Sequence, residues 1–171
     1  RQEQFTSRVT QPLNSRNQLI GLLAYQHNAN QQTTIFGFED ASLVSGVDGS
    51  ITWTHRVNQF FTVRPRFQYT ELTNQSTPFF ANRLNVSGLA DISGNNQEPA
   101  NWGPPTLGFS TITGLSDALP NFNRNRSVGG GAEAYWSHGR HNFTFGGDVR
   151  RVMVDIQSQQ NPRGAFTFNG T

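Results

Sequence analysis

The chain has 171 residues, a formal net charge of +2 and a hydrophobic fraction of only 34%. It contains no cysteine, which excludes disulfide frameworks, cysteine nucleophiles and thiolate metal sites. The small charge imbalance argues against nucleic acid as a partner, and no apolar run approaches the length of a membrane-spanning helix.

Three strand candidates lie in the first third of the chain. In FTSRVTQ, residues 5–11, apolar Phe5 and Val9 alternate with polar residues, which is the period of a strand with two different faces. QLIGLLAYQ, residues 18–26, is apolar on both faces, so its pattern does not orient it. GVDGSITWTHR, residues 46–56, alternates again, with Val47, Ile51 and Trp53 opposite Asp48, Ser50, Thr52 and Thr54.

The clearest alternation is in QFFTVRPRFQYT, residues 59–70. One face carries Phe61, Val63, Phe67 and Tyr69, and the other carries Thr62, Arg64, Arg66, Gln68 and Thr70. Proline lacks the N–H that a strand ladder needs. We therefore expect a strand whose pairing is weakened at Pro65.

Two further strand candidates follow each other near the end of the chain. GGGAEAYWSHG, residues 129–139, places Ala132, Ala134 and Trp136 opposite Glu133 and Tyr135. In GRHNFTFGGDVRR, residues 139–151, a turn over 139–142 precedes a strand with Phe143, Phe145 and Val149 opposite Asp148 and Arg150.

The connections alternate between short and long. Short polar turns lie at 14–18, 55–60 and 137–143, each with an arginine followed closely by an asparagine, whereas segments 28–45 and 71–127 are long. This alternation collects all the turns at one end of a sheet, as in an outer-membrane β-barrel with short periplasmic turns and long external loops. Strands of about 9 to 12 residues fit a tilted membrane span. A soluble β-sandwich would have shorter connections at both ends.

The predicted fold is therefore all-β, with antiparallel up-and-down strands that form a partial segment of a transmembrane β-barrel. Trp53 and Trp136 lie just before their turns, where an interfacial aromatic girdle is expected. We expect an open, curved sheet with six apolar residues on its convex face: Val47, Ile51, Phe61, Val63, Phe67 and Phe143. Because both edges and this face would be exposed, we expect the chain to be insoluble on its own.

Five segments resemble, in this order, the barrel of TonB-dependent receptors. They are IFGFED (35–40), TPFFANRLNVSG (77–88), GNNQEPANWGPP (94–105), GRHNFTFGGDVRR (139–151) and SQQNPRGAFTFNG (158–170). The Oar-like group, with its amino-terminal carboxypeptidase-regulatory-like domain, is the most similar. The resemblance implies a receptor of the Gram-negative outer membrane, in which a 22-stranded barrel is closed by a plug. TonB would pull on the plug to admit a ligand.

On this interpretation residues 1–171 are a barrel fragment of about six or seven strands with a long external loop at about 71–127. We find no plug, regulatory domain, TonB box or signal peptide in the sequence. The implied partners are outer-membrane lipid, the rest of the barrel and its plug, TonB through that plug, and a ligand of unknown class. The alternative is a secreted or surface-attached all-β adhesive or carbohydrate-binding module without transport.

Two groups of residues are candidates for contact with a ligand. The first lies on the polar side of the strands, where it faces ligand or plug, or else forms cross-strand ion pairs: Arg64, Arg66, Glu133, Asp148 and Arg150. The second group, Phe79, Phe80 and Trp102, lies in the long loop, where these residues and Phe109 either contact ligand or form the loop's own core.

The remaining motifs predict no catalytic, cofactor or metal site. GGGAEA and FTFGGD lack the glycine spacing of phosphate-binding loops, so we expect these glycines to permit bends or close approach. His138 and His141 have no acidic third ligand nearby. Since no serine, histidine and acid arrangement has a familiar context, we do not expect an enzyme.

Overall fold

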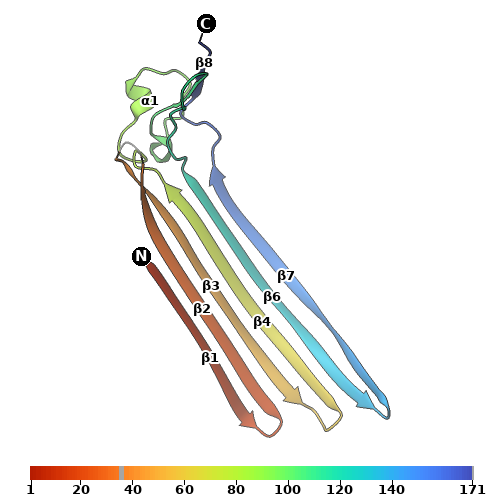
Figure 1. Cartoon of the computed structure of the whole chain (residues 1–171). Helices are drawn as coiled ribbons and strands as arrows, with labels where there is room; N and C mark the ends of the chain where they lie inside the picture. Colours follow the sequence, from red (N-terminus) through yellow and green to blue (C-terminus); the bar gives the residue numbers. More distant parts are fainter. Residues whose placement is uncertain (35–36, 171) are drawn as a thin grey trace.

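The computed structural model describes residues 1–34 and 37–170. Six long strands form one open sheet in which each strand pairs antiparallel with its neighbour along the chain (Figure 1). They are β1 (Gln2–Asn14), β2 (Asn17–Thr33), β3 (Glu39–Arg56), β4 (Phe61–Thr77), β6 (Asn121–His138) and β7 (His141–Ser158). The predicted all-β, up-and-down fold is confirmed.

The register places apolar side chains beside one another on one face of the sheet, which we call the outer face. Tyr25 pairs with Phe5 and Val47, and Ile51 pairs with Phe67. Since paired residues point to the same side, the same face receives all six residues predicted for it: Val47, Ile51, Phe61, Val63, Phe67 and Phe143. They are not covered by a second sheet, because Ile51 is 53% and Phe67 52% exposed.

The register also orients β2, which the sequence pattern left open. Leu19 pairs with Trp53, and Leu23 lies between Ser7 and Gly49, so both leucines belong to the outer face. Ile20 and Leu22 consequently point to the opposite side, which we call the inner face.

The strands are longer than the sequence predicted. β3 has 18 residues and β4 has 17, whereas a tilted strand needs about 9 to 11 to cross a membrane. The surplus lies away from the short turns, and there the outer face becomes charged with Glu71, Arg126 and Asp155. In β7 the inner face of that part carries Val152, Val154 and Ile156 instead of charged residues. The pattern of an apolar outer face and a polar inner face therefore ends while the strand continues.

This extension corrects two predicted connections. Segment 28–45 is mostly strand, because β2 continues to Thr33 and β3 begins at Glu39. The long external loop occupies 78–120 rather than 71–127. Ile35 and Phe36, at the start of the IFGFED motif, lie outside the described residues.

Pro65 interrupts pairing on one side only. The β3–β4 ladder omits Trp53 and Thr54 and then resumes in the same register, while Pro65 pairs with Ala132 in an unbroken β4–β6 ladder. The missing N–H of proline explains a gap on one side. The predicted strand with weakened pairing is confirmed.

All three short turns lie at the same end of the sheet (Figure 1). Gly139, with φ +60°, occupies the first central position of the two-residue turn between β6 and β7, as a type II′ hairpin requires. Asn14 and Asn58 brace the other two turns, because their side chains accept the backbone N–H of Arg16 at 2.9 Å and of Phe60 at 2.8 Å.

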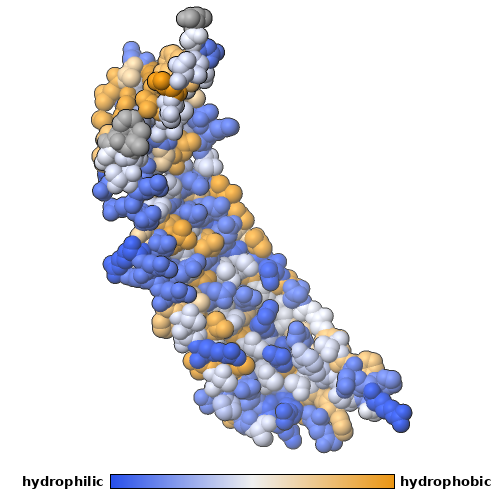
Figure 2. Space-filling view, viewed as in Figure 1, coloured by the Kyte–Doolittle hydropathy of each residue, from blue (hydrophilic) through white to orange (hydrophobic). Residues whose placement is uncertain are grey.

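A small folded cap lies at the opposite end. It contains α1 (Val86–Leu89), a 3-10 turn (Pro99–Asn101), β5 (Thr106–Phe109) and β8 (Ala165–Phe168), and β5 and β8 pair in parallel. Figure 2 shows hydrophobic residues gathered over this cap and a mixed surface along the visible face of the sheet. No helix within 1–34 and 37–170 is long and apolar enough to span a membrane.

Candidate functional site: a glycine-floored hollow

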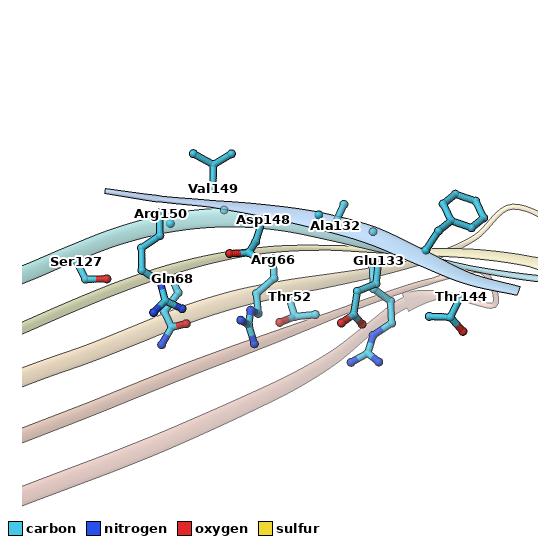
Figure 3. A pocket seen from close by; sticks show the side chains of 17 residues that line it. Thr52, Arg66, Gln68, Ser127, Ala132, Glu133, Thr144, Asp148, Val149 and Arg150 are labelled. Atoms are coloured by element: carbon cyan, nitrogen blue, oxygen red, sulfur yellow. The ribbon is translucent and has the colours of Figure 1, made fainter. Parts of the chain in front are cut away.

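The inner face of β4, β6 and β7 contains a hollow of about 480 Å³. Its lining includes every charged residue predicted for the polar side of the strands: Arg64, Arg66, Glu133, Asp148 and Arg150. Figure 3 shows Arg66, Glu133, Asp148 and Arg150 on one side of the sheet and Val149 on the other. The structure therefore brings the five residues together from three strands.

Glycines form the floor of the hollow because two strands approach each other closely there. A Cβ on Gly146 would lie 2.4 Å from the carbonyl oxygen of Ala132, and one on Gly131 would lie 2.7 Å from that of Gly147. Only glycine fits such an approach. A Cβ on Gly147, on the outer face, would meet nothing within 4 Å. The sequence predicted that these glycines permit either a bend or a close approach of the strands, and Gly146 permits a close approach.

The charged side chains around the hollow do not neutralise one another. Arg64 lies opposite Glu133 in the register, but the two are linked only through the phenol of Tyr135. That hydroxyl donates to the Glu133 carboxylate at 2.7 Å and accepts from Arg64 Nη1 at 3.5 Å. None of the ion pairs within 1–34 and 37–170 joins two of the five residues.

A glycine on β6 keeps two of the opposite charges apart, so that they do not form the cross-strand ion pair that was one of the two alternatives. Gly131 separates Arg66 on β4 from Asp148 on β7, and Gly129 similarly lies beside Arg150. Arg66 and Asp148 are thus two strands apart, whereas Arg64 and Glu133 face each other on adjacent strands with the Tyr135 hydroxyl between them. Three guanidinium groups and two carboxylates remain directed toward the hollow, where an ionic or strongly polar group can bind.

The loop aromatics behave mainly as a core. Phe79 and Phe80 pack with Phe38 at centroid distances of 4.9 and 4.7 Å, and Phe80 is only 8% exposed. Phe109 stacks on Phe168 at 5.4 Å. Trp102 is half-buried, and its indole N–H donates to the Gln97 carbonyl at 3.0 Å. Phe80 therefore has little ring surface left for a ligand.

A buried arginine that sequence reasoning missed holds the cap together. Arg163 is 3% exposed; its Nε donates to the Asn101 carbonyl at 2.9 Å, and its Nη1 donates to Asp117 at 2.6 Å and to the Ala118 carbonyl at 3.0 Å. Gly103 packs on the guanidinium, because a Cβ there would lie 2.4 Å from Arg163 Cζ. Burial raises the pKa of Asp117, and Arg163 offsets part of that rise.

Three of the motifs that carried the family resemblance meet at this arginine. The Ser87 hydroxyl, from 77–88, donates to the carbonyl of Gly103, from 94–105, at 2.9 Å, and lies 3.2 Å from the carbonyl of Arg163, from 158–170. Both glycine and arginine were within the quoted motifs, but nothing in the sequence relates one to the other.

The described residues contain no group of three or more His, Cys, Asp or Glu side chains that could hold a metal ion. His138 and His141 pair across their turn, and the His138 ring lies 5.3 Å from that of Trp136. These histidines belong to the aromatic band beside the turns.

A family model described as "Outer membrane beta barrel domain" matches residues 1–171. No curated protein and no solved structure matches the chain.

Proposed function

The chain belongs to the outer membrane beta-barrel domain family and is located in the outer membrane, and from this we propose that it is a wall segment of a TonB-dependent receptor that takes up a ligand. The segment would contribute the part of the barrel that passes the ligand and the external cap that first meets it. TonB would act through a plug that other parts of the receptor provide.

The hollow carries this proposal. In a membrane barrel the face opposite the lipid-facing side chains lines the lumen. Here that face presents Arg64, Arg66 and Arg150 without an ion-pair partner among the described residues. Charges enclosed in a finished barrel need water, plug or ligand groups to compensate them. These guanidiniums therefore favour a lumen that something polar enters.

The cap supports the same proposal. It lies at the end opposite the short turns, which is the external side of an outer-membrane barrel. Its 78–120 segment is folded around Arg163 and is tied to the residues that follow β7. A compact external element of this kind fits the mouth of a receptor better than a loose surface loop does.

The secreted-module alternative has no observation in its favour. A soluble module would cover the apolar residues of the outer face, yet Phe143 remains 47% and Val149 79% exposed. An exposed apolar surface that extends across a sheet favours contact with lipid.

Solute uptake by intact cells tests the proposal. Depletion of culture solutes, followed by untargeted mass spectrometry, is compared among wild type, a deletion of the gene and a strain without TonB. We expect at least one solute to be depleted only when both proteins are present. Uptake that persists fully without TonB contradicts the receptor proposal.

Two adjacent substitutions then test the hollow. Arg150→Gln removes a lumenal guanidinium, while Arg151→Gln removes a neighbouring one from the outer face. Losing one charge-assisted contact of about 1.5 to 3 kcal/mol should lower uptake roughly tenfold to a hundredfold in the first variant only. If both variants take up the solute equally, at equal amounts of folded barrel, the hollow is not part of the transport path.

A further inference from the structure

The end of the sheet with the short turns is positively charged and has no acidic residue. Each turn carries one arginine, namely Arg16, Arg56 and Arg140, which together we call the basic rim. Segments 14–18, 53–60 and 136–143 contain no Asp or Glu. All 13 basic residues of the chain are arginine, whose forked guanidinium binds phosphate oxygens in pairs.

The sheet brings these three arginines, which are far apart in the sequence, to one line. The Arg56 N–H donates to the Arg16 carbonyl at 2.7 Å, so the first two turns are in contact. The Ser137 N–H donates to the Phe60 carbonyl at 2.9 Å, which joins the second turn to the third. The rim is consequently continuous along the end of the sheet.

The rim borders the lipid-facing band at the level of a headgroup layer. On the outer face the Trp53 ring lies 5.3 Å from that of His55, and the Trp136 ring lies 5.3 Å from that of His138 and 5.5 Å from that of Phe143. Tryptophans mark the boundary between hydrocarbon and water. The arginines lie just beyond this boundary, where lipid phosphates are.

The opposite end of the lipid-facing band differs in one respect. There Arg124 lies 3.8 Å from Glu71 and Arg126 lies 2.8 Å from Asp155, so the protein supplies the anions. At the rim, no ion pair within the described chain involves Arg16, Arg56 or Arg140. Anions that balance these three charges must come from the surroundings.

We propose that the basic rim binds the phosphate headgroups of anionic phospholipids, in the membrane leaflet on the side of the short turns. This inference rests on membership of the outer-membrane family and does not depend on ligand uptake. A negative result for lipid binding would therefore leave the uptake proposal intact, and a negative result for uptake would leave this proposal intact. Each arginine near an anionic surface strengthens binding about fivefold, and three together on the order of a hundredfold.

Lipid titration of the intact protein tests this docking. The full-length outer-membrane protein, purified in detergent, is titrated with phosphatidylglycerol or phosphatidylcholine, and bound lipids are counted by native mass spectrometry. We expect phosphatidylglycerol to be preferred, and added salt to weaken the preference. The triple variant R16Q/R56Q/R140Q should lose it, by about fivefold for each charge removed.

The control variant R1Q/R8Q/R83Q removes the same charge from the start of β1, the inner face and the cap, and should keep the wild-type preference. The electrophoretic mobility of the unheated protein shows whether each variant is folded. If the triple variant does not fold, the single variant Arg140→Gln, in an exposed turn, replaces it. Equal phosphatidylglycerol binding by the rim and control variants overturns the proposal. So does a wild-type protein that binds both lipids equally.

Discussion

At the scale of single residues, the absence of a side chain at Gly146 shapes the candidate site. It lets β7 approach the backbone of β6 and leaves the space into which Asp148 and Arg150 project. In the sequence, Gly146 lies in FTFGGD, which lacks the glycine spacing of a phosphate-binding loop. The structure agrees, because the strand is fully paired with β6 and its backbone N–H groups are not gathered around an anion.

Alanine at Gly146 should therefore destabilise the barrel. The new Cβ would meet the Ala132 carbonyl oxygen at 2.4 Å, and overpacking of this kind costs about 1 to 3 kcal/mol. The urea midpoint of unfolding of the full-length protein in lipid vesicles measures the change. Gly147→Ala is the matched control and should change stability by less than about 0.5 kcal/mol; equal losses in both variants would refute this account of the floor.

The charged candidates show what a single sequence can predict about a site. Alternation correctly grouped Arg64, Arg66, Glu133, Asp148 and Arg150 on one face, because a side chain's face depends only on its parity within the strand. Alternation says nothing about which residues pair across strands. The interposed Gly129 and Gly131 become apparent only once the register is known.

At the scale of elements, the strands were predicted better than their ends. Beyond Arg150 in β7 the polarity inverts, with Val152, Val154 and Ile156 on the inner face and Arg151 and Asp155 on the outer. This part of the strand lies beyond the lipid, so an apolar outer face is no longer required. The alternation of apolar and polar residues therefore ends at the edge of the membrane, although the strand and its hydrogen bonds continue.

The cap was beyond prediction for a different reason. Arg163 and Asp117 are 46 positions apart, and their pairing depends on how two loops fold against each other. Gly103 and Ser87 complete the same contact from two further motifs. Only a three-dimensional structure relates these segments.

Arg163→Gln should loosen the cap without unfolding the sheet. It removes the contacts to Asn101, Asp117 and Ala118, and breaking a buried ion pair costs about 3 to 5 kcal/mol. Hydrogen exchange at the amides of β5 and β8 should accelerate, while that of β3 and β4 stays unchanged. Arg83→Gln, an exposed arginine of the same cap, is the control, and comparable acceleration in both variants would contradict a central role for Arg163.

At the scale of the whole molecule, the sheet has two different faces and two free edges. Within the described residues neither β1 nor β7 has a partner strand on its free edge. The outer face exposes apolar side chains between the short turns and the charged residues Glu71, Arg126 and Asp155. Such a sheet is stable where lipid covers one face and further strands extend the edges. Insolubility of the isolated chain stays a prediction.

The central claim is that the outer face contacts lipid and the inner face contacts water. Single cysteines introduced along β7 of the full-length protein test it directly, since the chain has none of its own. Spin labels at Phe143, Phe145 and Val149 should collide with oxygen dissolved in lipid, and labels at Thr144, Asp148 and Arg150 with a water-soluble nickel complex. We predict that accessibility to oxygen and to the nickel complex alternates from one residue to the next in this order. Uniform accessibility, or an alternation with the two sets of residues exchanged, would contradict the claim.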